Sequence, residues 1–157
     1  MPHHRLVRPD WIDSAPTLVE HSVVIDAPPS DVWAHVVDHR SWPEWFTDLG
    51  AVEPHRDTSV GGGRRVTVSG ITLDEEFTAV DVDEHFAFSV VRSPVPILAA
   101  LGESVRLEPV GDGCRVTYRQ GVEGRAGFGW LTDRAWRRAA RSLPIALENL
   151  RARVELT

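Results

Sequence analysis

The stretch SVVIDAPPSDVWAHVVDHRSWPEWF, residues 22–46, contains the succession of local signals on which the fold depends. Its first residues continue an alternating apolar pattern, which is typical of a strand. Pro28 and Pro29 end that strand, because proline donates no backbone hydrogen bond. Ser30 or Asp31 can then cap a helix, and prolines are tolerated just before a helix begins. The stretch therefore predicts a strand, a proline turn and a helix.

The predicted helix is amphipathic, and a second short helix follows it. Its apolar stripe contains Val32, Trp33, Val36 and Val37. Its polar side contains Asp31, His35, Asp38 and His39. Ser41 can cap the second helix, with Pro43 in its first turn. Trp42 and Trp45 lie on either side of Pro43 and Glu44, so a large aromatic surface follows the first helix directly.

The segments on either side of this stretch favour one sheet. Before it, the residues of Thr17–Ile25 alternate, and residues 1–16 are polar, which predicts an N-terminal arm with Trp11 and Ile12 as its anchors on the outside of the fold. After it, strand patterns separated by turn signals cover residues 50–56, 64–69, 71–82, 86–92, 103–109 and 114–122. Short links between successive strands predict antiparallel neighbours.

The pattern changes to a helical period from residue 127 to the C-terminus. One stripe contains Leu131, Ala135, Ala139, Leu143, Ala146, Leu147, Leu150 and Val154. Arginines occupy most of the other faces, which indicates a solvated surface. A helix of this length must cross the whole domain, and Pro144 predicts a kink within it. The expected fold class is α+β: about seven antiparallel strands curl around a long C-terminal helix, with two short helices after the first strand.

This order of elements resembles the Bet v 1-like or START-like helix-grip superfamily, and in particular its polyketide cyclase/dehydrase and lipid-transport branch. The segments that carry the resemblance are VVIDAPPSDVW (23–33), DHRSWPEW (38–45), VGGGRR (60–65), RLEPVGDGCRVTYR (106–119) and LENLRARVE (147–155). The resemblance implies a single domain over residues 17–157, with a hollow between sheet and helix. The two short helices would close one end of that hollow, and Trp42 and Trp45 would belong to the closure or to ordinary core.

Composition excludes several classes of partner. The net charge of −6 argues against nucleic acid and against an anionic membrane surface, since both need a basic field. No segment approaches the length of about 20 apolar residues that a membrane span requires. The single cysteine, Cys114, excludes an internal disulfide and suits a cytoplasmic protein. Neither a cofactor nor a metal is predicted, and the sequence leaves open whether the chain forms oligomers.

Polar residues at inward positions of the strands define the candidate site. An apolar cavity needs only a few polar groups to orient its ligand. Arg92 and Glu103 also lie in phase with inward residues near strand ends. The predicted ligand-binding residues are His21, Glu75, Phe77, Phe88, Arg92, Tyr118, Gln120, Trp136, Leu143 and Leu147.

The leading functional hypothesis is binding, or transport, of a hydrophobic small molecule such as a lipid or polyketide. The alternative is an aromatic polyketide cyclase or dehydratase, in which His21 or Glu75 acts as the base and Tyr118 or Arg92 as the hydrogen-bond donor. A protein-binding module of the chaperone-activator kind is a third hypothesis, and it would need an exposed apolar patch.

The sequence contains two further patterns. His35 and His39 are four residues apart, as metal ligands on a helix can be, but they lie on the polar face and no third ligand has matching spacing. They are therefore interpreted as solvated histidines. The apolar, proline-punctuated segment SPVPILAA lies between strands, and its residues 95–98 are predicted to form a lid over the cavity or to pack on the outer sheet or on a partner subunit.

Overall fold

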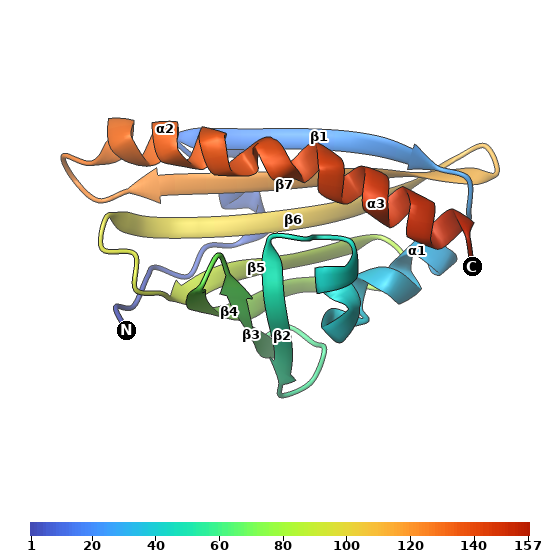
Figure 1. Ribbon diagram of the computed structural model, residues 1–157, viewed down its shortest axis with the longest axis horizontal. Coiled ribbons are helices and arrows are strands. Elements are labelled where there is room, and N and C mark those ends of the chain that lie inside the picture. The colour runs from blue at the N-terminus through green and yellow to red at the C-terminus, as the bar shows by residue number, and fades with distance from the viewer.

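The computed structural model describes residues 1–157, and seven antiparallel strands form one curved, unclosed sheet in the order β1-β7-β6-β5-β4-β3-β2. The strands are β1 (Thr17–Ile25), β2 (Leu49–His55), β3 (Gly63–Val68), β4 (Ile71–Asp81), β5 (His85–Arg92), β6 (Leu98–Val110) and β7 (Gly113–Gly124). The helices are η1 (Pro9–Ser14), α1 (Pro29–Val36), η2 (His39–Glu44), α2 (Gly129–Ala139), η3 (Ala140–Ser142) and α3 (Leu143–Glu155), where η marks a 3-10 helix. The predicted α+β helix-grip architecture is confirmed (Figure 1).

The core lies between the concave face of the sheet and the C-terminal helices. Strand direction changes strongly from β7 to β2, so the sheet curves around this space (Figure 1). Alternation along β7 predicts its inward residues correctly, and all of them are buried. They are Cys114, Val116, Tyr118 and Gln120. Their partners in β1 are the equally inward Ile25, Val23, His21 and Val19.

The two short helices form a corner at one end of the sheet. Helix α1 buries Val32, Trp33 and Val36, as its stripe predicts. The predicted cap is wrong, because the helix begins at Pro29 and no side chain hydrogen-bonds to its first turn. The second helix starts at His39, before the predicted cap Ser41, whose Oγ donates to the Asp38 carbonyl.

Strand β4 contains two irregularities that alternation alone does not predict. The pairing register with β5 shifts between Asp74 and Glu75 and again between Phe77 and Ala79. Phe77 lies in the core, but after the second shift Val80 packs against that core. Strict alternation along residues 71–82 predicts that Ala79 shares the inward face of Phe77, and this prediction is wrong, because the bulge moves every following side chain to the other face.

The C-terminal segment is one continuous path of three helices rather than one uniform helix. The 3-10 turn η3 separates α2 from α3, and Pro144 lies in the first turn of α3, where a missing N–H costs nothing. The 3-10 turn thus interrupts the helix directly before Pro144, where the sequence predicts a kink. The buried stripe of α3 is as expected, whereas Leu131 of α2 is exposed, which corrects its place in the stripe.

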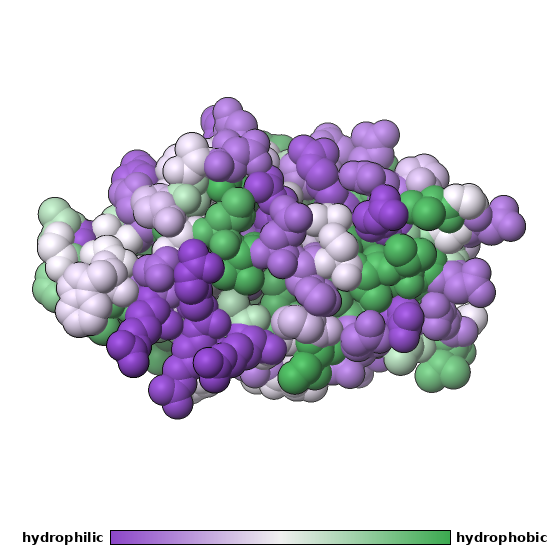
Figure 2. All heavy atoms as spheres, turned by 90° about the horizontal axis from the view of Figure 1, so that it is seen from above, coloured by the Kyte–Doolittle hydropathy of each residue, from purple (hydrophilic) through white to green (hydrophobic).

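The C-terminal part of α2 carries several exposed arginines. Arg134, Arg137 and Arg138 of α2 are exposed, and so is Arg141 in the following turn η3. Figure 2 shows a group of hydrophilic residues on this part of the surface, at the lower left. These observations agree with a solvated arginine face. No helix of the structure has the length and hydropathy needed to cross a bilayer.

The N-terminal residues lie against the convex face of the sheet, on the side opposite the core. Ile12 of η1 is almost completely buried. A Cβ atom added to Gly121 would lie 3.2 Å from the Ile12 Cα, and one added to Gly102 would lie 2.8 Å from Val7. Glycine in β6 and β7 therefore lets this segment approach the strands closely. The backbone bridge between His3 and Arg92 extends the contact to β5.

Candidate functional site

A cavity of about 280 Å³ lies between the concave sheet and helix α2. Seventeen of its 24 lining residues are hydrophobic, so its wall is mainly apolar. Ala135 and Ala139 line the cavity from α2 and are also exposed, which shows that it opens to solvent beside this helix. On the opposite side the lining contains a group of polar residues. They are Arg64, Glu75, Glu103, Tyr118 and Gln120, and we call them the polar wall.

A buried ion pair forms the first part of the polar wall. Arg64 Nε donates to Glu75 Oε2 over 2.6 Å, and the two side chains are 1% and 5% exposed. Strands β3 and β4 place these residues directly opposite each other. The guanidinium also stacks on aromatic rings, with its Cζ atom 4.0 Å from the Trp42 ring centroid and 4.8 Å from that of Phe88. The charge of Arg64 is therefore compensated from several directions.

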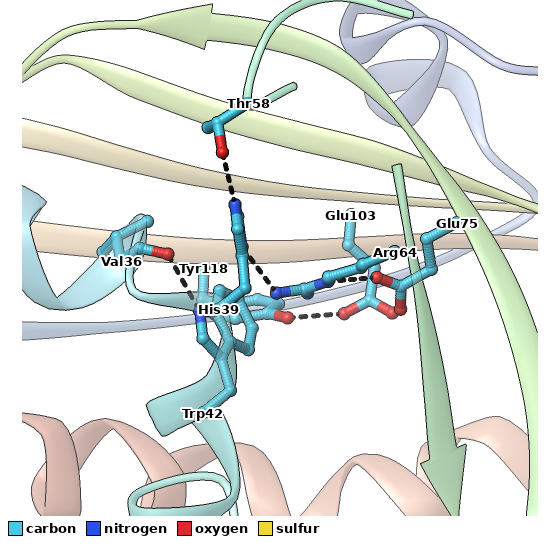
Figure 3. A network of polar contacts seen from close by, with 8 residues as sticks. All are labelled: Val36, His39, Trp42, Thr58, Arg64, Glu75, Glu103 and Tyr118. Carbon is cyan, nitrogen blue, oxygen red and sulfur yellow. Dashed lines mark hydrogen bonds and ion pairs between the residues drawn. The ribbon is translucent and has the colours of Figure 1, made fainter. Parts of the chain in front are cut away.

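His39 supports Arg64 from the helical corner (Figure 3). Arg64 Nη1 donates to His39 Nδ1 over 3.3 Å, so the ring proton lies on Nε2, which donates to Thr58 Oγ1 over 3.1 Å. The ring stacks on Phe77, with 4.9 Å between centroids. Burial and the neighbouring Arg64 lower the pKa of His39 to about 4, so the ring is neutral at pH 7. The interpretation of His39 as a solvated residue is wrong, because η2 turns it into the core.

Glu103 is the second carboxyl group of the polar wall. Its Oε1 accepts a 2.7 Å hydrogen bond from the Tyr118 hydroxyl and a 3.0 Å bond from Gln120 Nε2. Burial, followed by the negative charge of Glu75, raises the pKa of Glu103 to about 7. Burial and the adjacent Glu103 also raise the pKa of Tyr118, which therefore keeps its proton. Glu103 can thus exchange a proton near neutral pH.

Two polar atoms of the cavity-lining residues have no partner. Gln120 Oε1 and Trp136 Nε1 are both buried, and neither forms a hydrogen bond within the protein. Gln120 is only 4% exposed. Buried polar atoms are nearly always paired, so an unpaired one in a cavity wall requires an explanation.

The structure brings half of the predicted ligand-binding residues together. Those that line the cavity are Glu75, Phe88, Tyr118, Gln120 and Trp136. Those that do not are His21, Phe77, Arg92, Leu143 and Leu147. Phe77, Leu143 and Leu147 are packed into the core. His21 is half-buried on the inner face of β1, and Arg92 lies near the sheet margin, 3.9 Å from Asp74.

The predicted set omits Arg64, Glu103 and Trp42, which line the cavity, and His39, which supports it. The sequence contains a signal for Arg64. It shares the phase of Val66 and Val68 in β3, and the two-residue turn Ser69–Gly70 pairs Val68 with Ile71 and hence Arg64 with Glu75. Glu103 was in phase with inward residues, but nothing in the sequence shows that β6 begins as early as Leu98.

The segment of residues 95–98 lies at the cavity rather than away from it. Val95, Ile97 and Leu98 line the wall, and Leu98 is already the first residue of β6. The role of this segment as a lid stays a prediction. The structure holds no group of three histidine, cysteine or acidic residues arranged to hold a metal ion.

The titration of Glu103 makes a testable prediction about stability. Its pKa is raised from 4.5 to about 7, so the folded state binds more protons than the unfolded state between these values. Stability is therefore lost as the pH rises through this range, by about 3 kcal/mol in all. In Glu103→Gln the amide resembles the protonated acid, so this loss should be absent.

The measurement is urea denaturation of both proteins at pH 5, 6, 7 and 8. The free energy of unfolding of Glu103→Gln relative to the wild type should increase steadily with pH and level off above pH 7. Comparing the two proteins cancels the other titrating groups. A difference that stays constant from pH 5 to pH 8 would contradict the raised pKa.

A curved antiparallel sheet that holds a C-terminal helix and encloses an apolar cavity defines a helix-grip protein. The chain belongs to the family described as polyketide cyclase/dehydrase and lipid transport, whose model matches residues 16–155. Uncharacterized proteins of Mycobacterium tuberculosis and Mycobacterium bovis are 27% identical over 111 residues. The match covers 69% of this chain and 66%, just under two thirds, of the length of these relatives.

Solved structures share the fold over nearly the whole chain. The Zhui aromatase/cyclase from Streptomyces sp. R1128 has a TM-score of 0.76 at 17% identity, and covers 88% of this chain and 93% of its own. A START superfamily protein from Mycobacterium smegmatis has a TM-score of 0.72 at 16% identity, over 89% and 99%. Ara h 8.0201 gives 0.72 at 16%, over 89% and 98%. At these identities the likeness establishes the common fold.

Proposed function

We propose that this protein reversibly binds a hydrophobic small molecule, such as a lipid or a polyketide-like compound, in the cavity beneath α2. The observation that carries the proposal is the combination of an apolar wall with one buried polar wall. Such a combination is typical of sites that bind small ligands by burial and orient them with a few polar groups. Membership of a family described by polyketide chemistry and lipid transport supports it.

The size of the cavity limits the ligand. Its volume of about 280 Å³ lies at the lower end of the roughly 300–1,000 Å³ typical of small-molecule sites. This favours a compact molecule, with a few rings or one short chain. We also expect the protein to act in the cytoplasm, as its single cysteine suggested.

The first test is native mass spectrometry of the protein purified from its own host, followed by extraction of any bound compound. An apolar compound released from the protein would support the proposal and give its chemical class. The second test is binding of the neutral, apolar fluorescent probe Nile red. The common probe 1-anilinonaphthalene-8-sulfonate is unsuitable because it is anionic and also binds partly unfolded states.

A cavity-blocking variant makes the probe experiment specific. Ala139→Trp introduces an indole at the cavity mouth, whereas Arg138→Trp introduces the same group on the exposed face of the same helix. We expect Ala139→Trp to weaken Nile red binding about tenfold or more and Arg138→Trp to leave it unchanged. Equal binding by all three proteins would contradict binding in this cavity. An apo mass from the host together with no Nile red binding would contradict the proposal as a whole.

A second candidate function, aromatic polyketide cyclisation or dehydration, is favoured by one specific observation. Glu103 has a pKa of about 7 and lies in an apolar cavity, where a general base or acid works best at neutral pH. It replaces the bases expected from sequence, because His21 does not line the cavity and Glu75 is paired with Arg64. Tyr118 would donate a hydrogen bond to an enolate oxygen once released from Glu103.

Glu103→Gln separates catalysis from binding. If the protein is an enzyme, this variant should bind a polyketide mimic but no longer convert it to an aromatic product, which is followed by its absorbance. Conversion at an equal rate by wild type and Glu103→Gln would exclude Glu103 as the base. If neither protein converts the mimic while both bind it, binding alone remains the function.

A further inference from the structure

The polar wall of the cavity holds no free positive charge. Arg64 is its only cation, and Glu75 pairs with it at 2.6 Å. Glu103 adds a second carboxyl group close enough for the negative charge of Glu75 to raise its pKa. His39, which contacts Arg64 from behind, is neutral at pH 7 because burial lowers its pKa to about 4. The wall is therefore neutral when Glu103 holds a proton and carries one negative charge when it does not.

The hydrogen-bonding capacity of the wall is incompletely used. Glu103 Oε1 accepts both bonds, from Tyr118 and Gln120, so Oε2 takes part in neither. One N–H of the Gln120 amide donates to Glu103, and this contact fixes the orientation of the amide. Its Oε1 is then left as a buried acceptor without a donor. On α2, the buried Trp136 Nε1 is a donor without an acceptor.

We infer that the cavity selects neutral ligands that carry a hydroxyl group on an apolar skeleton and discriminates against carboxylates. The inference rests on the proposed function and names its ligand class. A hydroxyl group donates to the unpaired Gln120 Oε1 and satisfies it. A carboxylate has no proton to donate to that oxygen, finds Arg64 already paired, and lies beside Glu75 and Glu103. Burying an anion without a partner costs far more than burying a hydroxyl group.

Trp136 adds a secondary preference. A ligand that also carries a carbonyl or ether oxygen can accept from its Nε1, since Trp136 lines the same cavity and this buried donor has no other partner. Hydroxylated aromatic compounds with a second oxygen thus use both unpaired groups. Simple fatty acids have only a carboxylate as their polar group at neutral pH. They can reach these unpaired groups only by placing that negative charge against the polar wall.

Three probes with one skeleton test the inference: 2-naphthol, naphthalene and 2-naphthoate, titrated calorimetrically at pH 7.5. At this pH 2-naphthol is neutral and 2-naphthoate is ionised. We expect 2-naphthol to bind about tenfold or more tightly than 2-naphthoate, with naphthalene in between. In Gln120→Leu the affinity for 2-naphthol should fall about fivefold to tenfold, with naphthalene unaffected.

The matched control is Thr117→Val, on the other face of β7, which should leave all three affinities unchanged. If 2-naphthoate binds as tightly as 2-naphthol to the wild type, the inference is wrong while the proposed function stands. If none of the three probes binds while Nile red does, the inference is likewise wrong; if Nile red does not bind either and the protein from its host has an apo mass, the proposed function fails as well. The comparison within the wild-type protein decides the charge preference even where Gln120→Leu does not fold.

Discussion

Replacing Arg64 by methionine is expected to lower the free energy of unfolding by about 3–5 kcal/mol at pH 7. The side chain of Arg64 is 1% exposed and that of Glu75 is 5% exposed, so water cannot take over the role of either partner. Without Arg64, Glu75 must remain as a buried unpaired charge or take up a proton. Burial already raises the pKa of Glu75, and the loss of Arg64 would raise it further. Urea denaturation measures the effect.

An exposed ion pair provides a matched control. Arg40 Nη1 donates to Glu53 Oε2 over 2.6 Å, the same distance as in the buried pair, but the two side chains are 64% and 65% exposed. Exposed pairs contribute about 0–1 kcal/mol, so Arg40→Met should change stability little. Arg64→Met and Arg40→Met with equal effects would show that burial does not govern the strength of the first pair.

A double variant separates the need for the pair from the cost of breaking it. In Arg64→Met together with Glu75→Leu, neither charge remains, and most of the lost stability should return because apolar residues of similar volume often replace a buried ion pair without loss. If stability returns, the charges are not required for folding. Their position on the cavity wall then points to ligand recognition as the reason for them.

The sequence predicts which face of the sheet a side chain occupies better than it predicts how deeply that side chain is buried. Alternation in β1 and β7 assigns His21, Tyr118 and Gln120 to the concave face, and all three lie there. It does not indicate what covers that face. Tyr118 and Gln120 are on a strand covered by neighbours on both sides and by α2, whereas His21 is on the edge strand β1 and is half-buried.

Alternation alone does not show whether a charged residue at an inward strand position is buried. The pairing register, which identifies its partner on the next strand, is also needed. Lys, Arg, Asp and Glu are rarely buried unless paired, so Arg64 taken alone is assigned to solvent. Its partner Glu75 becomes visible only when the turn at Ser69–Gly70 is recognised as a two-residue hairpin turn, for which the positive φ angles of both residues are suited. By contrast, the bulge after Phe77 has no evident sequence signal, and the inward phase assigned to Ala79 fails there.

The tryptophans that follow the first helix give the second large effect. Trp42→Ala and Trp45→Ala should each cost about 3–5 kcal/mol, since both indoles are almost completely buried and their ring centroids are 4.5 Å apart. Trp130→Ala is the matched control, because Trp130 is 72% exposed and its loss should change stability by no more than about 0.5 kcal/mol. Urea denaturation of the three variants makes the comparison.

The two buried tryptophans should differ in what else they change. Trp42 Nε1 donates to the Val36 carbonyl over 2.8 Å, whereas Trp45 Nε1 is buried without a partner. Replacement by phenylalanine therefore leaves a buried carbonyl unpaired only at position 42, so Trp42→Phe should cost more than Trp45→Phe. Trp42 also lines the cavity and lies beneath Arg64, while Trp45 does not line it. Only substitutions of Trp42 should alter Nile red binding. Unchanged Nile red binding in the variants of both positions would mean that the pair acts solely as core, and that the helical corner has no part in the shape of the cavity.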